Sequence, residues 1–315
     1  MLLLSCQIGD KYNYGFQSGL PVDYTIGLKI YIWRKDRMIK IICDSTGDIP
    51  EEMRKQYDIT IVPLNVLFGT DSYQDGVNIT GAQFYKMLVE GKVHPTTSQP
   101  APGVFAEAYK KLAKQTDEIL VLTLSGGISG TYESAMQAKQ LVDSNLKIEV
   151  IDTKWTCAGL LLPTLKAARA IEKGMKMAEI TRMIQDILPK IRVYMIFDTL
   201  EYLRKGGRIG LAKALLGGML KLNPVLTLKD GVIHPVTQAR GRAKAVDILV
   251  DLMKKTGNPE EIVVEDATTP EELEDLVKRI SSAIPNAKII RTKVGPTIGV
   301  HAGPRIMVAG AISTS

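Results

Sequence analysis

Short apolar runs alternate with amphipathic stretches from Met38 onward, and this alternation restricts the fold more than any other feature of the sequence. The runs are rich in β-branched residues, which favour strands, and the stretches between them carry apolar side chains at helical spacing. We predict strands over 39–43, 60–66, 119–124 and 148–151, and helices over 80–89, 103–114 and 131–142. Strands that alternate with helices are typical of a parallel sheet covered by helices. The first half therefore predicts a Rossmann-like α/β domain.

The pattern changes near residue 155, where two consecutive helices are predicted before the next strand. Pro163 in the first of these helices is expected to kink it or to lie in its first turn. Asp230 and Gly231 form a dipeptide that favours a hairpin turn between two strands. We predict helices over 157–173, 178–188, 200–205, 244–255 and 270–283, and strands over 193–197, 224–228, 231–235, 262–265 and 287–292. The second half thus predicts a smaller α/β domain with an antiparallel element.

The length agrees with this division, since 315 residues suffice for about two domains of roughly 150 residues each. We expect an N-terminal domain over 38–190 and a C-terminal domain over 191–315. Residues 1–37 differ from both, because they hold 6 of the 18 aromatic residues. We expect an atypical N-terminal extension that arises from an early start codon. A lipoprotein signal at 3–6 is disfavoured, because no positively charged segment precedes it.

The charge balance argues against a nucleic-acid-binding protein. The net charge is +6, but residues 1–37 hold 5 of the 40 basic and 3 of the 34 acidic residues, which leaves +4 for the rest. These charges alternate in sign and form no basic tract of the kind that binds a phosphate backbone. No window approaches the ~18 apolar residues of a membrane span. We therefore expect a soluble, cytoplasmic protein without a nucleic-acid partner.

Metal and nucleotide cofactors are not expected either. The three cysteines are widely spaced and odd in number, which favours neither a disulfide framework nor a zinc site. The dinucleotide-binding pattern G-x-G-x-x-G and the P-loop pattern G-x-x-x-x-G-K-[ST] are both absent. The sequence thus predicts no cofactor and no metal.

Three loops at predicted strand ends carry hydroxyl and glycine residues, and open α/β sheets bind their ligands at such ends. These loops are 44–50, 95–100 and 124–132. A glycine-rich turn before a helix directs backbone N–H groups and the positive end of the helix dipole at one point, which suits an anion. The anion could be a phosphate or a carboxylate. Alternatively, the hydroxyl groups only cap helices and turns.

Catalysis by a serine needs a base beside it, and His301 is the best placed of the three histidines because glycines surround it. Ser125 does not lie in the nucleophile pattern G-x-S-x-G. A serine-dependent hydrolase or phosphotransfer enzyme that uses Ser125 and His301 on an acyl or phosphoryl group is nevertheless the alternative hypothesis. A separate cluster of arginines could bind an anionic partner or form a solvated basic face. It consists of Arg204, Arg208, Arg240 and Arg242.

Taken together, these segments resemble the DegV family of fatty-acid-binding proteins, of the type that serves as the binding subunit of a fatty acid kinase. The resemblance extends from Met38 to about Ala311. It depends on five motifs in this order: Asp44-Ser45-Thr46-Gly47-Asp48-Ile49-Pro50; Thr97-Ser98-Gln99-Pro100; Leu124-Ser125 through Ser129-Gly130-Thr131-Tyr132; Leu200-Glu201-Tyr202-Leu203 with Gly206-Gly207-Arg208-Ile209; and His301-Ala302-Gly303-Pro304.

The resemblance implies a two-domain α/β protein with one long-chain fatty acid, such as palmitate, stearate or oleate, in a tunnel between the domains. It implies a carrier without catalysis of its own, which presents the fatty acid to the kinase for acyl-phosphate formation in phospholipid synthesis. Transient contact with a membrane surface is compatible with such a role. The implied carboxylate-binding residues are Thr96, Thr97, Ser98, Ser125, Gly126 and His301, and the implied kinase-docking residues are Arg208 and Arg240.

The sequence departs from the family pattern at two positions. Gly126 follows Ser125 where the family usually has a second serine, so a backbone N–H is expected to replace a hydroxyl group there. Arg305 follows Gly303-Pro304 where the family commonly has glycine, and this places a cation near His301. We expect Arg305 to point either to solvent or to the ligand head group.

Overall fold

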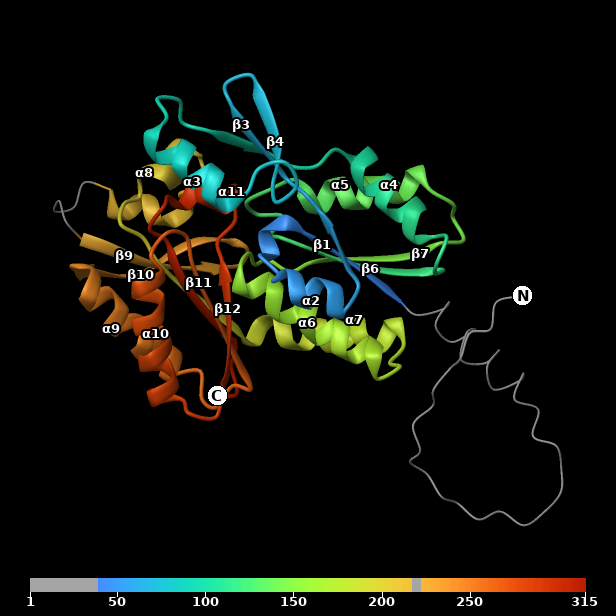
Figure 1. The fold of residues 1–315 in the computed structure, drawn as a ribbon. Coiled ribbons are helices and arrows are strands. Elements are labelled where there is room, and N and C mark those ends of the chain that lie inside the picture. The colour runs from blue at the N-terminus through green and yellow to red at the C-terminus, as the bar shows by residue number, and fades with distance from the viewer. Residues whose placement is uncertain (1–38, 217–221) are drawn as a thin grey trace, which may run out of the picture. The chain divides into compact units, whose positions relative to one another are not determined.

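The computed structural model describes residues 39–216 and 222–315, and this part of the chain belongs to one compact unit. The N-terminal extension expected over 1–37 lies outside the described residues. Three sheets form within the described residues, and helices cover the two larger ones (Figure 1). None of the described helices combines the length and the apolar character that crossing a membrane requires.

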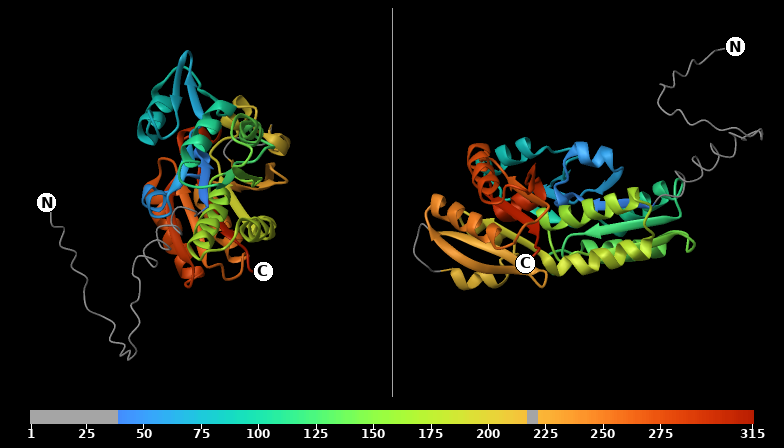
Figure 2. Two further views of the ribbon diagram at one scale, coloured as in Figure 1. Left: turned by 90° about the vertical axis from the view of Figure 1, so that its right-hand side faces the viewer. Right: turned by 90° about the horizontal axis from the view of Figure 1, so that it is seen from below.

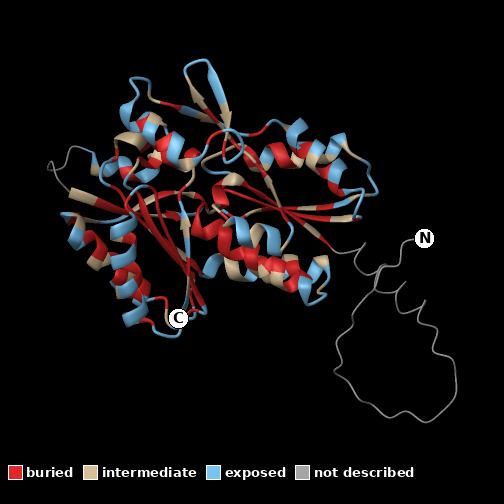
Figure 3. Cartoon of the chain, viewed as in Figure 1, coloured by how far each residue is buried: buried red, intermediate tan, exposed pale blue. Residues whose placement is uncertain are grey.

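The first sheet is parallel and has the strand order β2-β1-β6-β7. Its strands are β1 (Lys40–Asp44), β2 (Ile59–Val62), β6 (Glu118–Thr123) and β7 (Lys147–Asp152). Alternate residues of these strands face opposite layers. Ile42 and Val121 pack toward α4 (Pro102–Leu112) and α5 (Thr131–Ala138), whereas Ile41 and Leu120 pack toward α6 (Ala158–Glu172). Helices on both faces explain why these strands are continuous apolar runs, as predicted (Figure 3).

The strand predicted over 60–66 is wrong as a single element, because the chain leaves the first sheet at Pro63. Proline has no N–H to donate to a strand ladder. Beyond it, β3 (Asn65–Phe68) belongs to a separate antiparallel sheet with β4 (Asp71–Gln74) and β5 (Thr96–Ser98). In this sheet Val66 lies opposite Thr97. The hydroxyl-rich segment predicted as a loop is therefore partly a strand, which holds Thr97 against β3.

The third sheet has the order β10-β9-β8-β13-β11-β12, and only β11 and β12 run parallel to each other. Its strands are β8 (Ile191–Ile196), β9 (Leu222–Lys229), β10 (Val232–Arg240), β11 (Glu261–Asp266), β12 (Lys288–Lys293) and β13 (Met307–Ile312). The predicted hairpin is confirmed, since Asp230 and Gly231 have the positive φ angles of 51° and 82° that such a turn requires. Helices α9 (Arg242–Lys254) and α10 (Pro270–Ala283) cover one face.

Helix α6 covers the other face of this sheet and also packs against the first sheet, so it lies between the two (Figure 2). Twelve of its fifteen residues are buried. The side chains of Leu160, Leu161 and Leu165 share one core with strands of both sheets. Pro163 lies inside this helix, beyond the first turn. Helix α7 (Met177–Ile187) runs beside α6.

The remaining elements are short, and several of them surround the site described below. Helix α3 (Gly81–Glu90) begins at a capping box formed by Thr80 and Gln83. It lies beside α11 (Pro296–Ala302), which also packs against α8 (Glu201–Lys205). The helix predicted over 131–142 is shorter than expected and continues as a 3-10 turn. The other elements are α2 (Glu51–Gln56) and the 3-10 turns Ser45–Gly47, Lys139–Leu141, Leu188–Lys190 and Gly210–Leu215.

We predict that Gly310→Ala destabilises the protein by about 1–3 kcal/mol, because overpacking of a tight core displaces its neighbours. A Cβ atom at Gly310 in β13 would lie 2.7 Å from the Cβ atom of Ala158 in α6 and 3.0 Å from Val193. The measurement is urea unfolding followed by circular dichroism. Gly103→Ala in α4 is the matched control, since a Cβ atom there would have no neighbour within 4 Å. Equal stability of the two variants would contradict the close approach of α6 to the sheet.

Candidate functional site

A cavity lies where β5, the loop after β6, β8, α8 and α11 approach one another. It encloses about 640 Å³ of empty space, part of which is open to solvent. Its apolar wall consists of Leu64, Leu124, Ile128, Met195, Phe197, Leu203, Ile233, Ile298, Ala302 and Ile306. Its polar residues are Thr97, Ser98, Gln99, Ser129, Thr156, Arg208, Thr297 and His301. A largely apolar wall with a few convergent polar groups suits a ligand that has one polar end.

Thr97 and His301 form the central polar pair of this cavity. The Oγ1 atom of Thr97 lies 2.8 Å from Nε2 of His301, although 204 residues separate them in the sequence. Burial lowers the pKa of the His301 imidazole to about 4, and the nearby charges of Arg208 and His94 act in the same direction. The ring is therefore neutral at neutral pH, with one nitrogen that donates and one that accepts.

The backbone of Gly206 makes room for the His301 ring. A Cβ atom at this position would overlap Nδ1 of His301, so a larger residue would displace the imidazole. Nδ1 is buried, and no hydrogen-bond partner for it exists among the described residues. The glycine-rich segment after α8 thus fixes the ring position, while α11 supplies the residue itself.

Arg208 lies at the exposed side of the cavity and lines it. Its Nε atom donates to the carbonyl of Ile128 at 3.2 Å, and Nη1 donates to the carbonyl of Gly206 at 2.8 Å. Both hydrogen bonds go to backbone oxygens, so the guanidinium charge is not neutralised by them. Sequence reasoning assigned this residue only to partner docking and missed its place in the cavity wall.

The hydroxyl group of Ser125 has a structural contact instead of facing the cavity. It donates to the carbonyl of Gly231 at 2.7 Å and accepts from the N–H of Gly127 at 3.0 Å, and the residue is fully buried. Gly126 is exposed and donates its N–H to Asp152. Neither residue lines the cavity, whereas Ser129 of the same loop does. The hydroxyl of Ser125 is thus directed to the hairpin of the third sheet.

The remaining residues predicted to contact the ligand or a partner differ in whether they line the cavity. Ser98 lines the cavity and accepts a hydrogen bond from Asn65, while Thr96 is exposed and outside the lining. Arg240 is exposed at the end of β10. Gln99 and Thr297 line the cavity but were not selected from the sequence, although Gln99 stands within one of the quoted motifs.

Arg305 does not reach the cavity and is occupied by acidic neighbours. Its guanidinium pairs with Asp198 and with Glu272, at 3.1 and 2.5 Å, and the residue is absent from the cavity lining. Arg242 pairs with the same two carboxylates. The two arginines therefore belong to a local ion-pair network at the surface of the third sheet.

The loop over residues 44–50 does not line the cavity but holds a strand end that does. The carboxylate of Asp44 at the end of β1 accepts from the N–H of Leu124 at 2.6 Å and from both the N–H and the hydroxyl group of Thr46. Burial raises the pKa of Asp44 to about 6, although these donors oppose the shift. Leu124 belongs to the apolar wall of the cavity. The Asp44 carboxylate therefore holds the end of β6 at the point where this wall begins.

Comparisons with known proteins place the chain in a family. A family model described as "Uncharacterised protein, DegV family COG1307" matches residues 38–314. A DegV domain-containing protein of Caldanaerobacter subterraneus is 39% identical to this chain over 269 residues, which cover 84% of this chain and 95% of that protein.

Solved structures agree with this assignment. A Thermus thermophilus structure, described as showing fatty acid binding of a DegV family protein, matches with a TM-score of 0.81 and 31% identity and covers 88% of this chain and 99% of its own. A stearic-acid-binding protein from Eubacterium ventriosum matches with a TM-score of 0.81 and 29% identity, over 88% of this chain and 98% of its own. These relatives are described as binding proteins rather than as enzymes. The α/β fold and the resemblance inferred from the sequence are thus confirmed, and the chain belongs to the DegV family.

Proposed function

We propose that this protein binds one long-chain fatty acid, with its carboxylate beside Thr97 and His301 and its acyl chain along the apolar wall of the cavity. The observation that carries the proposal is the pairing of a hydroxyl group with a neutral imidazole at 2.8 Å in a cavity whose wall is largely apolar. The similarity to proteins described as fatty-acid-binding supports the same ligand class.

The apolar wall supplies the affinity. A chain of about 16 carbons gains roughly 0.8 kcal/mol for each buried CH₂ group, which amounts to more than about 10 kcal/mol before the costs of binding are subtracted. The side chains of Phe197, Met195 and Ile233 are available for this contact. Acyl chains of similar length therefore compete for the same cavity.

The polar residues determine which end of the ligand lies at the mouth. A carboxylate can leave water only where several donors satisfy it. The hydroxyl groups of Thr97 and Ser98 and the imidazole of His301 can donate to it, and the guanidinium of Arg208 lies in the same wall. Of the serines in the loop after β6, Ser129 is the one that lines the cavity, so we prefer it to Ser125 and Gly126 as a contact of the ligand, although its hydroxyl group also lies 2.9 Å from that of Thr131.

The carrier role forms the second part of the proposal. A carboxylate near the exposed Arg208 is accessible to a partner enzyme, and a fatty acid kinase is the partner that would convert it to an acyl phosphate for phospholipid synthesis. Arg208 and Arg240 are both exposed and would contact an acidic surface of such a kinase. A cytoplasmic location is consistent with an ATP-dependent partner.

We predict that lipid extracted from the purified protein contains a long-chain fatty acid at close to one molecule per chain. Native mass spectrometry before and after organic extraction gives both the identity and the ratio. An empty protein that also fails to bind added palmitate or oleate would disprove fatty-acid binding.

Thr97→Val should weaken fatty-acid binding by about tenfold or more, because a hydrogen bond to a charged group contributes about 1.5–3 kcal/mol. The measurement is competition with a fluorescent fatty acid. Thr60→Val in β2 is the matched control, since this strand threonine lies outside the cavity lining. The Ser125→Ala variant in the same assay shows whether the Ser125 hydroxyl group contributes to fatty-acid binding. An unchanged affinity of the Thr97→Val variant for the fatty acid would contradict the placement of the carboxylate beside Thr97 and His301.

The pKa of His301 should rise from about 4 when a fatty acid binds, because a neighbouring carboxylate favours the imidazolium form. NMR titration of the imidazole C–H signals, with and without palmitate, measures this shift. His234 on β10 provides the internal control, since it is not a residue of the cavity wall. A pKa for His301 that stays constant at saturating palmitate would contradict a carboxylate beside the ring.

A further inference from the structure

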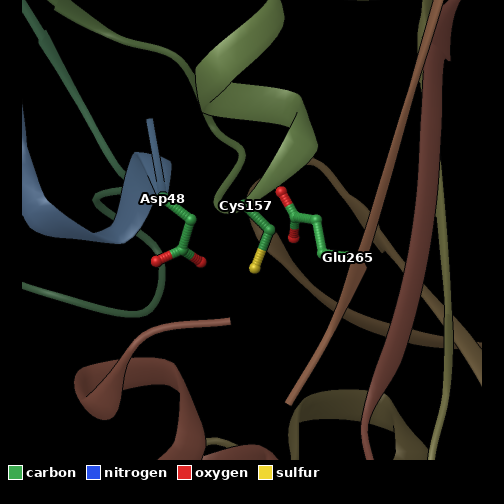
Figure 4. A group of neighbouring side chains, drawn as sticks. All are labelled: Asp48, Cys157 and Glu265. Atoms are coloured by element: carbon green, nitrogen blue, oxygen red, sulfur yellow. The ribbon is translucent and has the colours of Figure 1, made fainter. Parts of the chain in front are cut away.

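A second cluster of chemically active side chains lies outside the cavity wall. Asp48, Cys157 and Glu265 each present a ligand atom, and these atoms all lie within 4.8 Å of one another (Figure 4). The three residues come from different parts of the fold: the turn after β1, the residue before α6, and β11. None of them lines the fatty-acid cavity.

Two of the three side chains in this cluster are fully buried, Asp48 is half-buried, and three of the four carboxylate oxygens have no hydrogen-bond partner within the described residues. Cys157 and Glu265 are fully buried. Neither carboxylate oxygen of Glu265 has a hydrogen-bond partner within the described residues, and the same holds for Oδ2 of Asp48. The other oxygen of Asp48 accepts from the N–H of Gly295 at 3.0 Å. In Figure 4 the Cys157 thiol lies between the carboxyl groups of Asp48 and Glu265.

Such an arrangement is costly without a further partner. A buried polar atom without a hydrogen bond destabilises a fold, and most buried carboxylates are paired or bind metal ions. Asp48 and Glu265 also repel each other when both are charged. A cation between the two carboxyl groups and the thiol would satisfy all three.

We propose that Asp48, Cys157 and Glu265 form a binding site for a divalent transition metal ion of the zinc class. A thiolate selects zinc and similar soft or borderline ions over magnesium and calcium, and carboxylates complete zinc sites. Thiolate and carboxylate ligands of tetrahedral zinc lie about 3.5 Å apart, so small side-chain rotations close the observed spacing. Three protein ligands leave one further position for water.

Ion binding at this site would release protons to solvent from the thiol and from the protonated carboxyl groups, because burial raises the pKa of Glu265 to about 8 and that of Asp48 above its usual range. Burial and the neighbouring carboxylates raise the pKa of Cys157 well above its usual range, so the thiol is protonated without a cation. A zinc-class ion displaces that proton, because the thiolate is the ligand form. The positive end of the dipole of α6, a helix of fifteen residues that begins after Cys157, favours the resulting thiolate.

A bound ion would also cross-link three elements of the fold. Its ligands would join the turn after β1, the start of α6 and β11. It would therefore stabilise the contact between the first and third sheets.

The test uses the full-length protein after treatment with a chelator. Binding of Zn²⁺ is measured by calorimetry, and binding of Co²⁺ is measured by absorption spectroscopy. We expect one ion per chain, a thiolate-to-cobalt charge-transfer band in the near ultraviolet, and a higher thermal unfolding midpoint with Zn²⁺. Cys157→Ser should abolish the band, and both Cys157→Ser and Glu265→Gln should weaken Zn²⁺ binding by more than about tenfold, since even outer-sphere changes cost that much.

The matched control is Cys43→Ser, which removes a second fully buried thiol outside the cluster and should keep the cobalt band. The double variant Cys6→Ser/Cys43→Ser keeps Cys157 as its only thiol and should show the full band, so the proposal stays testable if Cys157→Ser fails to fold. Absence of the band in this double variant, or of Zn²⁺ binding to the unaltered protein, would overturn the proposal. So would a band that persists in a folded Cys157→Ser variant.

Discussion

The burial of α6 between two sheets is the interaction on which the rest of the structure depends. Apolar side chains such as Leu160 and Leu165 enter a core shared by strands of the parallel and the mixed sheet, so neither sheet buries that face without this helix. Arg169, one of its three residues that are not buried, forms a bidentate ion pair with Glu261 of β11. The helix thereby joins the two sheets along its whole length, from the apolar contacts of its first turns to this ion pair in its last.

The cavity follows from this arrangement, because loops from both sheets meet beside it. Asp44 fixes the end of β6 through the N–H of Leu124, and the hairpin of the third sheet reaches the same loop through Gly231 and Ser125. Hydroxyl groups that look equivalent in the sequence thus have different roles. Some hold the loops together, whereas that of Thr97 contacts His301 in the cavity wall.

Much of the fold was predictable, because it depends on local signals. The alternation of buried strands with amphipathic helices identified the parallel sheet, and Asp230-Gly231 identified the hairpin turn. Helix 270–283 was predicted with its observed bounds, since Pro270 marks its first turn. Strand β5 was missed because three hydroxyl residues give no apolar alternation. Strand β3 was merged with β2 because its separation depends on a partner in another sheet.

By itself, the sequence determined the α/β class, the order of five motifs and hence the family, since these features are local in the chain. Only the tertiary structure decided which side chains meet. Thr97 contacts His301 across 204 residues, and Ser125 contacts Gly231 across 106. The cluster of Asp48, Cys157 and Glu265 likewise joins three distant segments. Contacts of this kind depend on how helices and sheets pack, and packing depends on the burial of the whole core rather than on any one segment.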